Sequence, residues 1–150
     1  MRWVWGENKQ RRRENLRVDR RSDEVGLWRL RGFSLEDDEV DDMMSKVQKY
    51  DSLIMDLRGN HGGWEDTLVR LAGHFFSSET KIADARERKK LRTIKAKPPS
   101  KTYKGKLVVL VDSQTASAAE IFSRLVQLTG RGRVFGDQTA GCNEGSAVSA

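Results

Sequence analysis

Two short segments of the chain contain residue types that can perform chemistry together. Ser117 lies within a run of mostly small residues, Ser113-Gln-Thr-Ala-Ser-Ala-Ala-Glu120. The second segment is a glycine loop with the sequence Arg58-Gly-Asn-His-Gly-Gly63. A serine hydroxyl becomes a nucleophile when a base activates it, and free backbone amides can stabilise an oxyanion. One amide from each segment would give two donors beside the hydroxyl. The same residue types also fit a simple helix cap and a turn, which are more common.

Each segment follows an expected strand. Ser52-Leu-Ile-Met-Asp-Leu57 is a short apolar run that stops at the glycine loop, and Lys106-Leu-Val-Val-Leu-Val111 is the strongest strand pattern in the chain. The carboxyl ends of parallel strands meet at one edge of a sheet, where ligands bind in open α/β folds. We therefore expect both segments to face one site.

The other expected elements alternate in type along the chain. We predict a capping box of Ser34 with Asp37 and a hairpin of two exposed strands over 81–95. Further strands are expected over 25–33 and 132–136, and helices over 35–49, 65–76 and 116–128. Strands separated by helices predict an α/β domain in which strands 52–57, 107–111 and 132–136 share one mostly parallel sheet.

The first 22 residues differ from the rest in composition. They contain eight Lys and Arg against three Asp and Glu, in a chain whose net charge is +6. We expect a basic, flexible arm over 1–22 and one packed domain over 23–150. No apolar stretch has the length of a signal-peptide core or a membrane span. Cys142 is the only cysteine, and His61 and His74 are far apart in sequence, so no metal and no cofactor are expected.

Three blocks of sequence resemble the carboxy-terminal processing, or tail-specific, protease family. Leu53–Gly63 is similar to the strand and glycine loop of that family, Leu107–Phe122 to its nucleophile segment, and Gly130–Gly141 to the strand and turn that follow. Order and spacing agree across residues 25–145, and three matched blocks are more specific than one. The resemblance implies a crotonase-like α/β fold, incomplete at its C-terminal end, so that 23–150 would be a partial peptidase domain. No PDZ-like stretch fits before residue 25.

The resemblance also implies roles for individual residues. The family nucleophile falls on Ser117, and the oxyanion amides fall on Ala118 and on the loop of Gly62 and Gly63, of which Gly63 is preferred. In the Ser/Lys branch the general base is a lysine that here is replaced by Cys142. A thiol does not replace a desolvated amine as a base. The segment Thr139–Gly145 looks closer to the tricorn-like Ser-His-Glu branch, whose histidine and glutamate would both lie outside these residues.

Several residues have competing interpretations. His61 adjoins the glycine loop, but its ring can equally point to solvent. His74 is expected to be packed, and Cys142 to be an ordinary small residue. Asp56 and Arg58 are expected to brace the glycine loop, and Glu120 to be favoured by the dipole of its helix.

The resulting prediction is a serine-type peptidase that cleaves peptide bonds through a Ser117 acyl-enzyme. Its partners would be protein or peptide substrates, recognised through their C-terminal ends, and the resemblance suggests a bacterial, periplasmic or extracytoplasmic location. One alternative is a catalytically incomplete relative that only binds peptides. Another is a basic nucleic-acid-binding protein, suggested by an isoelectric point near 9.7 and the run Arg86–Arg92. No recognised nucleic-acid reader motif accompanies these basic residues.

Overall fold

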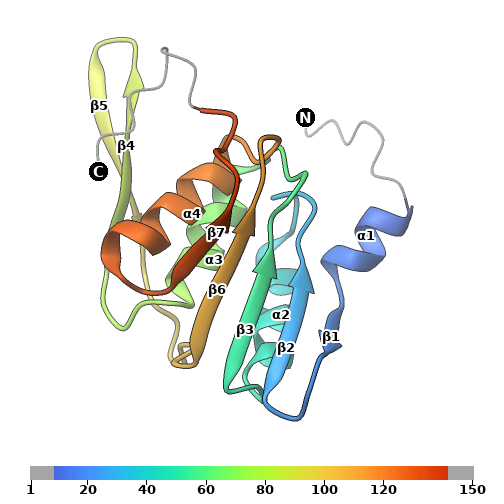
Figure 1. Ribbon diagram of the computed structural model, residues 1–150. Coiled ribbons are helices and arrows are strands. Elements are labelled where there is room, and N and C mark those ends of the chain that lie inside the picture. Colours follow the sequence, from blue (N-terminus) through green and yellow to red (C-terminus); the bar gives the residue numbers. More distant parts are fainter. Residues whose placement is uncertain (1–8, 142–150) are drawn as a thin grey trace.

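The computed structural model describes residues 9–141 and contains one five-stranded sheet (Figure 1). The order across the sheet is β1-β2-β3-β6-β7, and each neighbouring pair is parallel except β1 with β2. The bounds are β1 Val18–Arg20, β2 Val25–Arg29, β3 Ser52–Asp56, β6 Lys106–Val111 and β7 Arg133–Gly136. The predicted α/β architecture, with β3, β6 and β7 in one layer, is confirmed.

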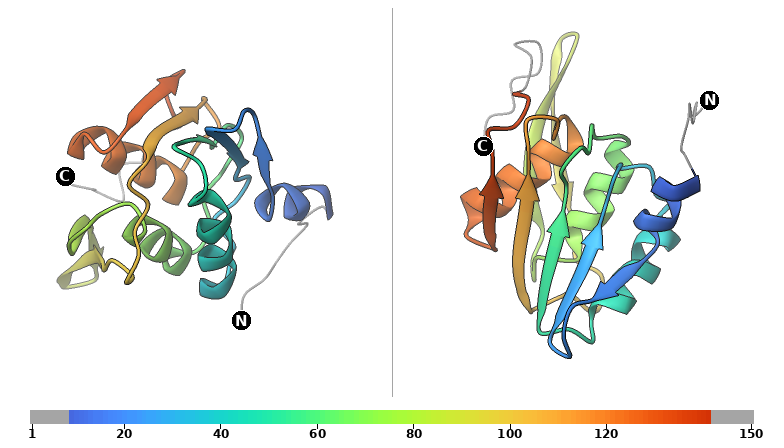
Figure 2. Two further views of the ribbon diagram at one scale, coloured as in Figure 1. Left: turned by 90° about the horizontal axis from the view of Figure 1, so that it is seen from below. Right: turned by 45° about the vertical axis from the view of Figure 1, so that its right-hand side comes forward.

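Three helices lie side by side on one face of this sheet (Figures 1 and 2). They are α2 (Asp37–Val47), α3 (Glu65–Gly73) and α4 (Ala118–Thr129). Alternate residues of the strands point toward them, because side chains alternate across a strand, and join a single buried cluster. Since α3 follows β3 and α4 follows β6, both helices begin at the carboxyl edge of the sheet. The core thereby places two helix starts at the expected site.

Helix α2 begins two residues later than the capping box of Ser34 and Asp37 would place it. Its N-cap is Glu36, whose backbone amide donates to the Glu39 carboxylate at 3.1 Å. Buried Thr67 accounts for the shift, because its hydroxyl donates to the Leu35 carbonyl at 2.7 Å and accepts from the Leu35 amide at 3.2 Å. These bonds hold Leu35, the residue before the N-cap, outside the helix.

Part of the basic arm expected over 1–22 has regular secondary structure. Helix α1 (Lys9–Asn15) leads into β1, which pairs with β2 along the edge of the sheet. Asn15 is the anchor: its side chain accepts from the Arg31 amide at 2.6 Å, and its carbonyl accepts from the Trp28 indole at 2.9 Å. A high charge density did not prevent packing, because the polar groups of this buried asparagine are paired with the domain.

The hairpin expected over 81–95 is formed by β4 (Thr80–Glu87) and β5 (Lys90–Ala96). It is a separate two-stranded sheet that projects from the domain (Figure 1). Buried Ile94 and Ala96 of β5 pack toward α3, while the other residues of β5 are exposed. The hairpin is therefore attached at its base and free at its tip.

Candidate active site

The two predicted segments meet at the carboxyl edge of the sheet. The loop after β3 and the loop after β6 lie together because these strands are parallel neighbours in the sheet. Gly62 lies directly against Ser117: a Cβ placed on Gly62 would be 2.7 Å from the Ser117 Cβ and 2.9 Å from the Ala118 amide nitrogen. The absence of a side chain at Gly62 is thus what leaves the start of α4 open. The expected proximity of Ser117 to the glycine loop is confirmed.

Ser117 is exposed and has an unusual backbone conformation. It is the N-cap of α4, with φ 54° and ψ −127°. Non-glycine residues with positive φ are uncommon, and such strain costs about 1–3 kcal/mol and is concentrated at functional sites. Of the described residues, only Arg88 is another non-glycine residue with positive φ.

Two backbone amides beside Ser117 have no acceptor. Ala118 is the first residue of α4, so its amide has no intrahelical partner. Neither this amide nor that of Gly63 donates a hydrogen bond to any residue within 9–141. Phe33 holds the glycine loop in place, because its amide donates to the Gly62 carbonyl at 2.9 Å and its carbonyl accepts from the Trp64 amide at 2.6 Å. These bonds leave the Gly63 amide free.

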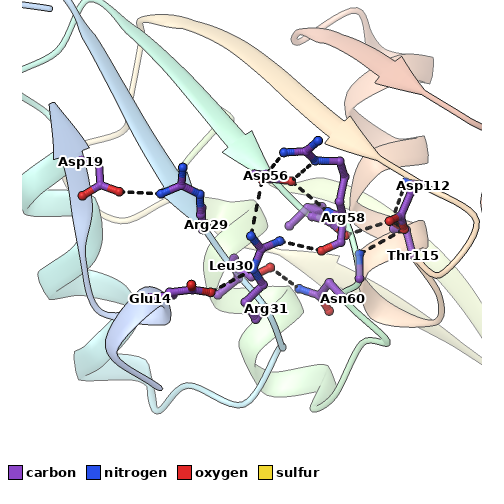
Figure 3. A network of polar contacts seen from close by, with 12 residues as sticks. Glu14, Asp19, Arg29, Leu30, Arg31, Asp56, Arg58, Asn60, Asp112 and Thr115 are labelled. Carbon is purple, nitrogen blue, oxygen red and sulfur yellow. Dashed lines mark hydrogen bonds and ion pairs between the residues drawn. The ribbon is translucent and has the colours of Figure 1, made fainter. Parts of the chain in front are cut away.

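Asn60 sets the shape of the glycine loop (Figure 3). It is fully buried, its side chain donates to the Leu30 carbonyl at 2.8 Å, and its side-chain oxygen accepts from the Gly62 amide at 2.8 Å. Its carbonyl accepts from the Ala116 amide at 3.0 Å, one residue before Ser117. One residue therefore joins β2, the glycine loop and the serine loop. The sequence analysis missed this role, although an asparagine between glycines in a loop is a recognisable signal.

Asp112 and Thr115 tie the two loops together from the other side (Figure 3). The Thr115 hydroxyl donates to the Leu57 carbonyl at 2.9 Å. The Asp112 carboxylate accepts from the Gly59 and Gln114 amides, both at 3.0 Å. The Gly59 amide is the largest cause of a lowered pKa at Asp112, so the carboxylate stays charged and keeps both bonds.

Asp56 and Arg58 brace the beginning of the glycine loop, as expected (Figure 3). The Asp56 carboxylate is 1% exposed and accepts from the Arg58 guanidinium at 2.9 and 3.0 Å. Arg31 adds a charge at 3.7 Å and donates to the Arg58 carbonyl at 2.7 Å. Burial by itself would raise the pKa of Asp56, but these bonds and charges outweigh it and lower the pKa. The carboxylate is therefore ionised although it is buried.

The segment after β7 also reaches the start of α4. The Thr139 hydroxyl donates to the Glu120 carboxylate at 2.7 Å, and the Ala140 amide donates to the Thr115 carbonyl at 3.1 Å. Glu120 is nearly buried, and the Thr139 hydroxyl gives its carboxylate a specific partner in addition to the helix dipole. The third matched block thus lies against the nucleophile segment. Cys142, where the Ser/Lys branch has its base, lies outside the described residues.

The two histidines occupy different environments. His61 is exposed in the glycine loop. His74 is buried, as expected, with Nε2 2.8 Å from the Asp41 carboxylate, which also binds Arg70. It follows the last residue of α3, at the end of that helix away from the glycine loop. His74 is therefore a packed residue rather than a partner of the serine.

Within residues 9–141, no group of three or more His, Cys, Asp or Glu side chains is arranged to hold a metal ion. In the same range no helix combines the length and apolar character that crossing a membrane requires.

A serine at a strained helix start, beside free amides at the carboxyl edge of a parallel sheet, is the arrangement of an α/β serine hydrolase. The sequence model of peptidase family S41 matches residues 24–149, so the chain belongs to peptidase family S41.

Two bacterial relatives have names that agree with this family. The chain is 36% identical over 96 residues to a tail-specific protease of Haemophilus influenzae, covering 63% of this chain and 14% of that protein. It is 30% identical over 126 residues to a carboxyl-terminal-processing protease of Picosynechococcus, covering 82% of this chain and 30% of that protein. The chain therefore spans less than a third of either relative.

Solved structures share the fold. The photosystem II D1 C-terminal processing protease has a TM-score of 0.65 at 26% identity, over 78% of this chain and 31% of that chain. Mature CPAF has a TM-score of 0.67 at 16% identity, over 78% of this chain and 38% of that chain, and this likeness concerns the fold alone. The expected resemblance to tail-specific proteases is confirmed, and the finer assignment to the tricorn-like branch stays a prediction.

Proposed function

We propose that this chain is the serine-bearing core of a peptidase that cleaves peptide bonds through an acyl-enzyme on Ser117. The observation that carries the proposal is the exposed, strained Ser117 lying against Gly62, with the free amides of Ala118 and Gly63 in the two segments that meet there. Membership of peptidase family S41 supports the same reaction.

In this mechanism the Ser117 hydroxyl attacks the carbonyl carbon of the scissile bond and its proton passes to a general base. The oxygen of the tetrahedral intermediate accepts hydrogen bonds from the Gly63 and Ala118 amides, which stabilise the charge that develops there. Gly62 contributes by leaving the Ala118 amide uncovered. Collapse of the intermediate releases the amine, and water then hydrolyses the acyl-enzyme.

The general base is the part of the machinery that these residues do not supply. Neither described histidine is placed as a base by its contacts, and the Ser/Lys position is Cys142. We therefore expect the isolated chain to hydrolyse peptides slowly or not at all, with a base contributed by a longer protein. The replacement at 142 also favours one second candidate, a catalytically incomplete relative that binds peptides without cleaving them.

The relatives' names, tail-specific and carboxyl-terminal-processing, support a preference for the C-terminal ends of protein substrates. Since both relatives are bacterial, we also propose a bacterial protein that acts in the periplasm or another extracytoplasmic location.

The decisive experiment compares Ser117→Ala with Ser113→Ala in the full-length protein. Ser113 is an exposed serine of the same loop, so it controls for loss of a hydroxyl there. Ser117→Ala should reduce kcat/KM for an unfolded protein substrate by roughly 10³-fold or more, while Ser113→Ala should keep wild-type turnover. A fluorophosphonate should add its mass to the peptide containing Ser117. Unchanged turnover in Ser117→Ala would show that the nucleophile has been misassigned.

A further inference from the structure

The β4–β5 hairpin lies along α3 and extends past the end of that helix nearest the site. At the C-terminal end of α3, a Cβ on Gly73 would lie 2.3 Å from the Lys97 carbonyl. At the N-terminal end, the Arg92 guanidinium binds the Glu65 carboxylate at 2.7 and 2.9 Å. Strand β5 thus runs in the same direction as α3, and the residues before Arg92 project beyond the helix start.

This projecting part is the hairpin tip, residues 86–91. Glu65 is two residues after Gly63, so the tip stands at the same edge of the molecule as the oxyanion loop. The hairpin rises beyond the carboxyl ends of the parallel strands in both side views (Figures 1 and 2). Salt bridges from Arg92 to Glu65 and to Glu87 fix this position.

The hairpin tip carries unpaired positive charge. Its basic residues are Arg86, Arg88, Lys89 and Lys90, all exposed, and none has an ion-pair partner within residues 9–141. Below the tip the pattern differs, because Lys81 binds Asp84 at 2.6 Å and Lys95 lies 3.3 Å from Glu79. Leu91 in the tip is 74% exposed and adds an apolar contact surface. Within the hairpin, the charges available to a ligand are therefore concentrated at the tip.

We propose that the hairpin tip is a specificity element that binds acidic residues of a peptide whose scissile bond lies at Ser117. This inference rests on the proposed function and adds a substrate class to it: peptides with aspartate or glutamate flanking the cleaved segment. The tip is a single hairpin turn, and the basic helix α1 lies on the far side of the molecule (Figure 1). A short acidic peptide fits this isolated patch better than a nucleic acid, which needs a continuous basic track.

The test uses the full-length protein with Ser117→Ala, so that binding is measured without cleavage. Fluorescence anisotropy compares two labelled peptides of one sequence, flanked either by three glutamates or by three glutamines. The tip variant is Arg88→Gln, Lys89→Gln, Lys90→Gln. The control variant is Lys101→Gln, Lys104→Gln, Lys106→Gln, which removes the same charge near the amino end of β6, at the opposite edge of the sheet.

We expect the acidic peptide to bind roughly 3- to 10-fold more tightly than the neutral one at low salt, a preference that 0.5 M salt removes. The tip variant should lose most of this preference and the control variant should keep it. In the cleaving protein, the same difference should appear in kcat/KM for the two peptides. An equal loss in both variants would overturn the proposal, as would a preference that the tip variant retains.

Two further arms separate this proposal from its alternatives. The first arm measures binding of a single-stranded oligonucleotide and of a vesicle containing anionic lipid. If either binds through the tip more tightly than the acidic peptide does, the proposal of a peptide-binding tip is overturned. Peptide binding with the expected preference, but without turnover in the wild-type protein, would support the tip assignment and contradict the proposed peptidase activity. The two proposals can therefore fail independently.

Discussion

Ser117 keeps its strained backbone because both of its sides are anchored. The amide of Ala116 donates to the Asn60 carbonyl at 3.0 Å, and the Ser117 carbonyl accepts from the Ile121 amide at 2.9 Å. The serine is therefore fixed between the glycine loop and the first turn of α4. Strain of this kind survives only where the surrounding structure determines it.

This strain predicts an unusual order of stability for two variants that both lack the hydroxyl. Ser117→Gly should be more stable than Ser117→Ala by about 1 kcal/mol, because glycine adopts positive φ without steric cost. At Ser113, whose φ is not positive, the order should reverse. Urea unfolding of the four variants measures both differences. Equal stability of the two Ser117 variants would contradict the strained conformation.

Gly62 offers a second test at the level of one residue. Gly62→Ala places a methyl group against the Ser117 Cβ, the Ala118 amide and the Ala116 carbonyl, at a residue with φ +95°. We expect a loss of about 2–4 kcal/mol in unfolding free energy and loss of peptidase activity. Gly130→Ala is the matched control, since φ there is +70° and a Cβ would meet nothing within 4 Å. It should cost only about 1 kcal/mol and preserve activity, and comparable losses in both variants would exclude the contact as the cause.

At the scale of elements, the end of β3 depends on a buried charge. The lowered pKa of Asp56 means that its carboxylate stabilises the fold above the aspartate pKa of the unfolded chain, about 3.9. That contribution is lost as the pH falls through the lower folded pKa, because the native state must then take up a proton. Asp56→Asn should therefore be less stable at neutral pH.

The same variant should show a shallower decline of unfolding free energy below about pH 4 than the wild type. Urea unfolding at a series of pH values between about 2 and 7 measures this slope. The control is Asp137→Asn, which removes an exposed carboxylate that forms no salt bridge within residues 9–141, and it should follow the wild type. A wild-type slope in Asp56→Asn would show that another group causes the acid sensitivity.

At the scale of the whole molecule, the basic surface is divided. Helix α1 and the hairpin tip lie beyond opposite edges of the five-stranded sheet (Figure 1), so they form no continuous track for a nucleic acid. We expect DNA and RNA to bind weakly and without sequence preference, and moderate salt to abolish binding, because phosphate contacts release counterions. Anisotropy titrations at two salt concentrations measure this. Tight, sequence-selective binding at physiological salt would instead favour the nucleic-acid alternative.

The sequence by itself determined the features that local patterns control. The apolar runs of β3 and β6, the periodicity of α2, α3 and α4, and the hairpin are all found close to their predicted positions. Adjacent parallel strands must end at a common edge, so the meeting of the glycine loop with Ser117 also followed from sequence.

The tertiary structure alone decided which polar residues hold these segments. Asn60 binds three carbonyl or amide partners from separate parts of the chain, and the bonds of Asn15 convert a basic segment into α1 and β1. The hairpin tip became a candidate specificity element only because Arg92 meets Glu65, a residue 27 positions away. Local composition cannot predict such contacts. In the unfolded chain water satisfies the polar groups of these side chains, and their protein partners come close only when the chain folds.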